Sequence, residues 1–151
     1  MRFRFAVPAM MLLCGLSLSH AQEHATSSKA VTGGVSVTVV SPYRAAYRSV
    51  LQFLKKKDYT IDNANEEIGQ ITTAVTGTEG WKGTRSWVQV SLFQQDETHT
   101  SLKIAVANQN RSHTVLAGRG EYHAPKVNMD ESQNLADEMK EALTSSSSTG
   151  S

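Results

Sequence analysis

The apolar residues between Ser41 and Lys57 recur at the spacing of one helix face. At offsets 0, 3, 4, 7, 8 and 11 stand Tyr43, Ala46, Tyr47, Val50, Leu51 and Leu54. Residues at these offsets form a single stripe on a helix, and such a stripe is stable only when it is buried. Ser41 is a suitable N-cap, Pro42 suits the first helical position, and the lysines that end at Lys57 suit the negative end of the helix dipole. The pattern predicts an amphipathic helix that ends near Lys57.

Apolar and polar residues alternate in other parts of the chain, which is typical of strands with one buried face. Strands are predicted at residues 35–39, 59–62, 72–76, 87–93 and 102–106, with a less regular sixth segment at Thr114–Ala117. Polar and glycine-rich segments between them predict turns. A second helix is predicted from about Asp130, because helical spacing recurs at Leu135, Met139, Ala142 and Leu143.

These elements predict the α+β class. We expect a two-layer sandwich in which two helices cover one face of a largely antiparallel sheet of 4–6 strands, in the order β-α-β-β-β-(β)-α. The predicted domain spans residues 35–143, which is long enough to bury a core of its own. A flexible lead-in is predicted at 22–34 and a disordered Ser-rich tail at 144–151.

Residues 1–21 show the three parts of a secretory signal peptide. Arg2 and Arg4 supply positive charge, an apolar run extends from Phe5 to Leu18, and a cut is predicted after Ala21. A membrane anchor is the alternative, but the run is short for a span of about 20 residues. We therefore expect an exported protein, periplasmic or secreted, with no transmembrane span once the signal is removed.

Cys14 is the only cysteine, and it lies within the predicted signal. Lipoprotein anchoring through Cys14 is an alternative to free export, although bulky Leu13 precedes it where such sites carry small residues. If the signal is cleaved at Ala21, the mature chain has neither a disulfide nor a thiolate nucleophile.

The charge of the predicted mature chain is close to neutral. Loss of Arg2 and Arg4 reduces the 15 basic residues to 13, against 14 acidic residues. This balance gives no electrostatic footprint for nucleic acid. The remaining histidines, at 24, 99, 113 and 123, show no helical i, i+4 pair that would suit zinc, so neither a metal nor a cofactor is predicted.

The segment from the first helix through Tyr59-Thr60-Ile61-Asp62 to Gly69-Gln70-Ile71-Thr72-Thr73 resembles a pattern of small bacterial envelope proteins. In that pattern a helix runs into "Gly-Tyr-x-Ile", then acids, then "Gly-x-Ile-x-Thr". It is similar to the helix-grip domains of the BamC-type subunit of the outer-membrane β-barrel assembly machinery and to related periplasmic families. Asp58 departs from the pattern, which has glycine before the tyrosine. The resemblance implies an envelope scaffold or binding module and offers no known catalytic residues to carry over to this chain. It also suggests a tight turn or bulge at Gly69.

Two groups of side chains are candidates for binding. The first is Trp81, Lys82, Arg85 and Trp87 among glycines, since an exposed tryptophan beside a cation can grip a sugar, a peptide or a lipid headgroup. In the alternative interpretation Trp87 caps the outer edge of a strand and Trp81 folds back onto the sheet. The second is a basic helix flank of Arg44, Arg48 and Lys55, which could meet anionic lipid or an acidic partner, or could simply be solvated.

No catalytic constellation is recognisable in the chain. It contains no Gly-x-Ser-x-Gly elbow and no phosphate-binding glycine loop. The sequence therefore favours a non-enzymatic exported binding or assembly module of the bacterial cell envelope, whose partner would be an envelope protein, a lipid or a glycan. A carrier of a small apolar ligand in a helix–sheet groove is the first alternative, and an envelope hydrolase is the second.

Overall fold

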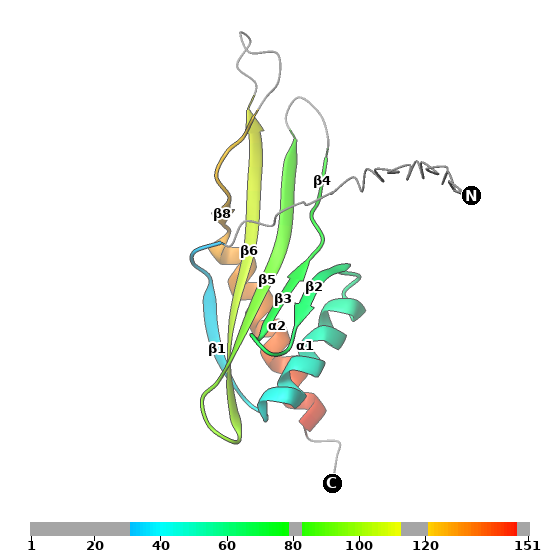
Figure 1. Ribbon diagram of the computed structural model, residues 1–151, viewed down its shortest axis with the longest axis vertical. Coiled ribbons are helices and arrows are strands. Elements are labelled where there is room, and N and C mark those ends of the chain that lie inside the picture. Colours follow the sequence, from blue (N-terminus) through cyan, green and yellow to red (C-terminus); the bar gives the residue numbers. More distant parts are fainter. Residues whose placement is uncertain (1–30, 79–82, 113–120, 148–151) are drawn as a thin grey trace, which may run out of the picture.

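The computed structural model describes residues 31–78, 83–112 and 121–147 of the chain. Within these ranges the chain forms two helices and a mostly antiparallel sheet (Figure 1), which confirms the predicted α+β class. In chain order the elements are β1 (Val35–Val40), α1 (Tyr43–Lys56), β2 (Ile61–Asn65), β3 (Gln70–Thr73), β4 (Thr76–Gly77), β5 (Thr84–Gln94), β6 (His99–Ser112), β7 (Glu121–Tyr122), β8 (Lys126–Val127) and α2 (Met129–Ser147).

The main path of the sheet is β1-β6-β5-β3-β2, and every neighbouring pair is antiparallel. Five strands form this path, and the short strands beside it take the sheet beyond the expected 4–6. Three further strands of two residues each lie off this path, β4 on β5 and both β7 and β8 on β6. The expected order β-α-β-β-β-(β)-α is therefore too short, because four main-path strands and three short ones follow α1. Thr114–Ala117 lies outside the described residues.

Both helices pack on the same face of the sheet. The predicted α1 stripe is confirmed, since Ala46, Tyr47, Val50 and Leu54 are buried. From α2 the core receives Leu135, Ala136, Met139 and Leu143. The sheet contributes Val39, Ile71, Val88, Val90, Leu92, Leu102, Ile104 and Val106. These side chains fill the space between helices and sheet with apolar surface that is removed from water.

α1 ends in a Schellman motif. The N–H of Asp58 donates to the carbonyl of Lys55 at 3.1 Å, and the N–H of Tyr59 donates to the carbonyl of Leu54 at 3.0 Å. This pattern requires a left-handed residue after the C-cap, and Asp58 occupies that position with φ 62°. It is the one non-glycine with positive φ in the described part of the chain. The glycine of the resembled pattern would therefore suit this position sterically.

The turn between β2 and β3 also depends on a left-handed residue. The side-chain oxygen of Asn65 accepts hydrogen bonds from the N–H groups of Glu67 and Ile68, and Gly69 follows with φ 65°. A Cβ at Gly69 would lie 2.3 Å from the carbonyl oxygen of Leu92. The tight turn suggested at Gly69 from the sequence is thus present.

α2 is longer than predicted. It continues to Ser147, so Thr144–Ser147, which we expected in the disordered tail, are helical. The predicted helix ended where the apolar spacing ends, at Leu143, but helical hydrogen bonding continues past the last core contact. No helix in the described ranges has the length and apolar character needed to cross a membrane.

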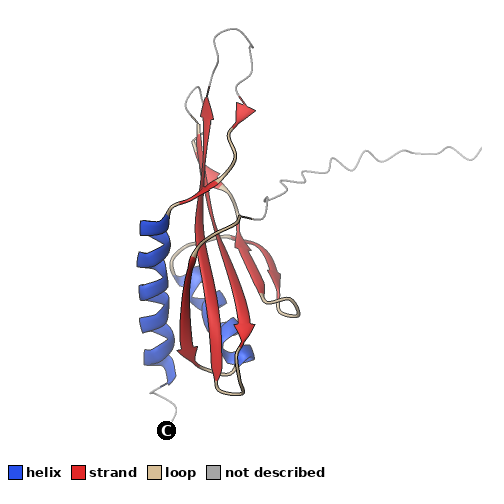
Figure 2. Ribbon diagram, turned by 90° about the vertical axis from the view of Figure 1, so that its left-hand side faces the viewer, coloured by secondary structure: helices blue, strands red, loops and turns tan. Residues whose placement is uncertain are grey.

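β5 and β6 form one long hairpin that reaches beyond both helices. Figure 2 shows α2 beside only the lower part of these strands, while their upper part continues with the short strands alongside. We call residues Thr84–Trp87 of β5 and Ala107–Ser112 of β6 the distal hairpin. Its residues project past the helix–sheet core.

Candidate functional site

The helix-facing side of the distal hairpin changes from aliphatic to polar where the strands leave the core. Val88 pairs with Val106, and both are buried. One step further Ser86 pairs with Asn108, and the next pair on this face is Thr84 with Asn110. Alternation along each strand places these pairs on one face. No helix covers them in the described structure, so the apolar layer ends where its partner ends.

The opposite side of the hairpin, which we call the outer face, also buries apolar residues. Trp87 pairs with Ala107 there, and the indole is only 5% exposed. Ala105 is buried beside it on the same face. None of these three belongs to the main core, so the sheet buries a second, smaller apolar region on its outer face.

The segment just before β1 crosses this outer face. The N–H of Val31 donates to the side-chain oxygen of Gln89 at 3.3 Å. A Cβ at Gly34, where φ is 122°, would lie 2.5 Å from the carbonyl oxygen of Ile104. Only glycine permits this approach. The end of the predicted lead-in, residues 31–34, is therefore laid against the sheet rather than extending away from it.

A cation–aromatic arrangement lies further along the outer face. The Arg85 guanidinium carbon is 3.9 Å from the centre of the Tyr122 ring, and that of Arg111 is 5.4 Å from the same centre. Arg85 pairs with Gln109 across β5 and β6, and Arg111 pairs with Tyr122 across β6 and β7. The ring attracts a cation placed over its face. We call Arg85, Trp87, Gln109, Arg111 and Tyr122 the distal cluster.

One polar atom in the distal cluster has no hydrogen-bond partner. The Nε1 of Trp87 is the only buried side-chain nitrogen or oxygen without one in the described structure. Buried indole N–H groups are usually paired, and leaving such a donor unpaired costs about 1–3 kcal/mol. By contrast, Gln109 is engaged, because its Nε2 donates to the carbonyl of His123 at 2.7 Å.

The first predicted binding group is therefore only partly placed. Arg85 and Trp87 lie two residues apart on the outer face of β5, whereas Trp81 and Lys82 lie outside the described residues. Trp87 does not offer an exposed ring, because its indole is buried. The packed alternative describes this tryptophan correctly.

Sequence reasoning missed the members of the distal cluster that follow β5. Gln109, Arg111 and Tyr122 come from the segment where the strand pattern becomes irregular. The alternating outer-face positions 107, 109 and 111 could have been found by continuing the predicted fifth strand beyond Val106. The position of Tyr122 depends on a two-residue strand that leaves no periodic signal.

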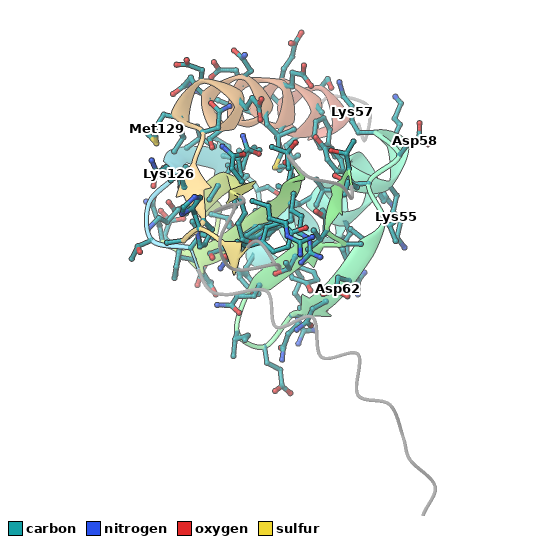
Figure 3. All side chains as sticks on the ribbon, turned by 90° about the horizontal axis from the view of Figure 1, so that it is seen from above. Lys55, Lys57, Asp58, Asp62, Lys126 and Met129 are labelled. Atoms are coloured by element: carbon teal, nitrogen blue, oxygen red, sulfur yellow. The ribbon has the colours of Figure 1, made fainter. Side chains whose placement is uncertain are left out.

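The second predicted group, the basic helix flank, is spread over the solvent side of α1. Arg44 is 83% exposed and lies 3.7 Å from a carboxylate oxygen of Glu66, while Arg48 and Lys55 are exposed. Figure 3 shows Lys55 at the opposite side of the molecule from Lys126. The flank and the β8 edge that carries Lys126 are thus separate surfaces.

Titratable groups with shifted pKa values are explained by local structure. Burial, followed by the charge of Glu66, raises the pKa values of Tyr43 and Tyr47. The backbone N–H of Thr98, assisted by the His99 ring, lowers the pKa of Asp96 from 3.8 to about 2. In the described structure Asp96 organises the turn between β5 and β6, and no cluster of three metal-ligating side chains is found there.

No model of a known protein family matches the chain, and no curated protein is found to be similar to it.

Proposed function

We propose that the protein is a non-enzymatic, exported binding or assembly module of the bacterial cell envelope, and that Arg85, Arg111 and Tyr122 of the distal cluster form its contact surface. The observation that carries this proposal is the projection of the distal hairpin beyond the core, with Arg85, Arg111 and Tyr122 gathered on its outer face. The expected signal peptide at residues 1–21 supports export, and the resemblance of residues 35–106 to BamC-type domains supports an envelope location.

Apart from the buried Trp87, the residue types of the distal cluster suit recognition better than stability. Strand residues outside a core gain little by burial, so arginine and tyrosine here add little to the fold. Both residue types are enriched at the centres of protein interfaces because they combine apolar area with hydrogen-bonding groups. Stacking on Tyr122 also holds the Arg85 guanidinium in place before a partner arrives, which lowers the entropy cost of binding.

The two alternative functions have less support from the structure. A carrier of an apolar ligand requires space between helices and sheet, but Val50, Leu54, Ile104 and Met139 are fully buried there. A hydrolase requires titratable groups with shifted pKa values that face one another in a cleft. Among the described carboxylates, Asp96 has a resolved shift, and its hydrogen bonds serve a turn.

The contact surface is tested by a charge reversal with a matched control. The purified protein carrying Arg85→Glu is compared with one carrying Arg48→Glu, which alters an exposed arginine on α1. Each is used to capture partners from envelope fractions and from soluble fractions. We expect an envelope component that binds the unmodified protein and the Arg48→Glu variant, and that is lost with Arg85→Glu at an unchanged melting temperature.

Two results would contradict the proposal. Equal capture by both variants would show that Arg85 takes no part in the contact, and capture from the soluble fraction alone would contradict the envelope location. Export is tested separately by N-terminal sequencing of the protein isolated from its host. A chain that begins at Gln22 supports cleavage, and one that retains Met1 refutes it.

A further inference from the structure

A pocket lined by both apolar and polar residues lies on the helix-facing side of the distal hairpin, opposite the distal cluster. It has a volume of about 560 Å³, within the range of about 300–1,000 Å³ typical of small-ligand sites. Its polar lining residues are Asn108, Asn110, His123, Lys126 and Asn128, and none of the lining residues is acidic. We call this site the amide pocket.

Asparagine is an unexpected residue at two of these positions. Asn108 and Asn110 lie within β6 and alternate with Gln109, although asparagine is depleted in strands. The aliphatic residues that precede them on this face serve the core, but the asparagines lie beyond it. Departures from local preference concentrate at functional sites, so these residues point to a role other than folding.

The walls of the amide pocket are fixed by backbone hydrogen bonds. The N–H of His123 donates to the carbonyl of Asn110 at 3.0 Å, and the N–H of Asn128 donates to the carbonyl of Val106 at 2.8 Å. Between these points β8 pairs with β6 through Lys126 and Val127. The segment is therefore held against the sheet along its length, and the site is formed before a ligand arrives.

The side chains in the pocket are largely unused by the protein. Within the described structure the amides of Asn108 and Asn110 make no hydrogen bond, and Lys126 makes no ion pair. Asn128 is engaged on one side, because its oxygen accepts from the N–H of Glu131 at 3.3 Å. Figure 3, which looks down on the distal end, shows Lys126 beside Met129, at the edge where β8 leads into α2.

From these groups we infer that the amide pocket binds an acidic saccharide, a sugar that carries both neighbouring hydroxyl groups and a carboxylate. Each side-chain amide offers donors and an acceptor, which match sugar hydroxyls, since these also donate and accept. A carboxylate matches the unpaired ammonium of Lys126. A simple anion uses only the donors and leaves the amide oxygens unmatched.

A peptide ligand fits the site less well. Peptides commonly bind by adding a strand to a free sheet edge, but β6 already pairs with β5 on one side and with β7 and β8 on the other. The inference goes beyond the proposed function, because it assigns a second site with a ligand class of its own. The amide pocket shares no residue with the distal cluster, so an experiment can refute the proposal for one site without refuting the proposal for the other.

The test is a titration of the purified, ¹⁵N-labelled protein with digalacturonic acid, in which the NMR signals of the backbone amides are recorded at each step. Neutral galactobiose and inorganic phosphate serve as comparison ligands. We expect signals of residues 108–110 and 126–128 to shift with digalacturonic acid, weakly with galactobiose, and not with phosphate. The variant Lys126→Ala should raise the dissociation constant about tenfold, as loss of a hydrogen bond to a charged group does.

Matched variants separate the pocket from general effects. Lys103→Ala removes an exposed lysine from the outer face of β6, and Asn134→Ala removes an exposed asparagine from α2; both should bind normally. Lys126→Arg should restore most of the affinity. Digalacturonic acid that shifts no signal at 108–110 and 126–128 overturns the proposal. So do equal shifts with phosphate or galactobiose, and an equal loss of affinity with Lys103→Ala.

Discussion

Replacement of Asp58 by glycine should make the protein more stable, although it removes a side chain. Asp58 is the left-handed residue of the Schellman motif that ends α1, with φ 62°. Its N–H and that of Tyr59 donate back to the last turn of the helix, so the backbone there cannot relax without losing both bonds. Figure 3 shows Asp58 at the surface near Lys57, where a shorter side chain leaves no cavity.

Two opposing terms set the size of this effect. An L-residue in the left-handed region costs roughly 1–2 kcal/mol, less for aspartate because its short polar side chain can hydrogen-bond locally. Glycine loses about 0.5–1 kcal/mol more backbone entropy on folding than other residues. The difference favours Asp58→Gly by up to about 1 kcal/mol, together with a contribution from removing a negative charge at the negative end of the helix.

The measurement is urea unfolding of Asp58→Gly, Asp58→Asn and Asp58→Ala at constant salt. Asn removes the charge but tolerates the left-handed conformation, and Ala retains the full steric cost. We expect the stability order Gly, then Asn, then Ala. Asp62→Gly is the matched control, because Asp62 is an exposed aspartate of β2 that lacks the positive φ of Asp58, so glycine there relieves no left-handed backbone and only adds chain entropy. Stabilisation by Asp62→Gly, or no difference between Gly and Ala at residue 58, would refute the reasoning.

Three further predictions follow from the structure. Gly69→Ala should cost about 2–4 kcal/mol in urea unfolding, because it combines a left-handed backbone with a Cβ placed against the Leu92 carbonyl; an unchanged midpoint contradicts this turn geometry. Trp87→Ala should cost about 3–5 kcal/mol, as expected for a buried aromatic residue, whereas an exposed ring would cost almost nothing. Because folding lowers the pKa of Asp96 to about 2, its contribution should be complete above pH 3.8 and be lost as the pH falls toward 2. Asp96→Asn should make the melting temperature depend less steeply on pH between 3.8 and 2. An equally steep dependence in the variant would exclude Asp96 as its cause.

The main elements of this fold could be predicted because each has a local physical origin. The α1 stripe of Tyr47, Val50 and Leu54 follows from the need to bury one helix face, and alternating valines follow from the same need in a strand. A tight turn or bulge at Gly69 was suggested by the resemblance to envelope domains, and the structure has a tight turn there, with Gly69 in a left-handed conformation that few other residues adopt. The extension of α2 to Ser147 was missed, since the residues beyond Leu143 bury no face that would mark them as helical.

The distal cluster and the amide pocket could not be predicted in this way. Arg85 and Tyr122 meet because two strands and a short third one are paired in a particular register, and register is a property of the whole sheet. Trp87 is likewise buried on the outer face of the sheet, and the segment at Gly34 runs beside that face. The sequence of a single segment determines which of its own faces is apolar. Only the pairing of the strands, and the part of the sheet that the helices leave uncovered, decide which distant side chains come to share a surface.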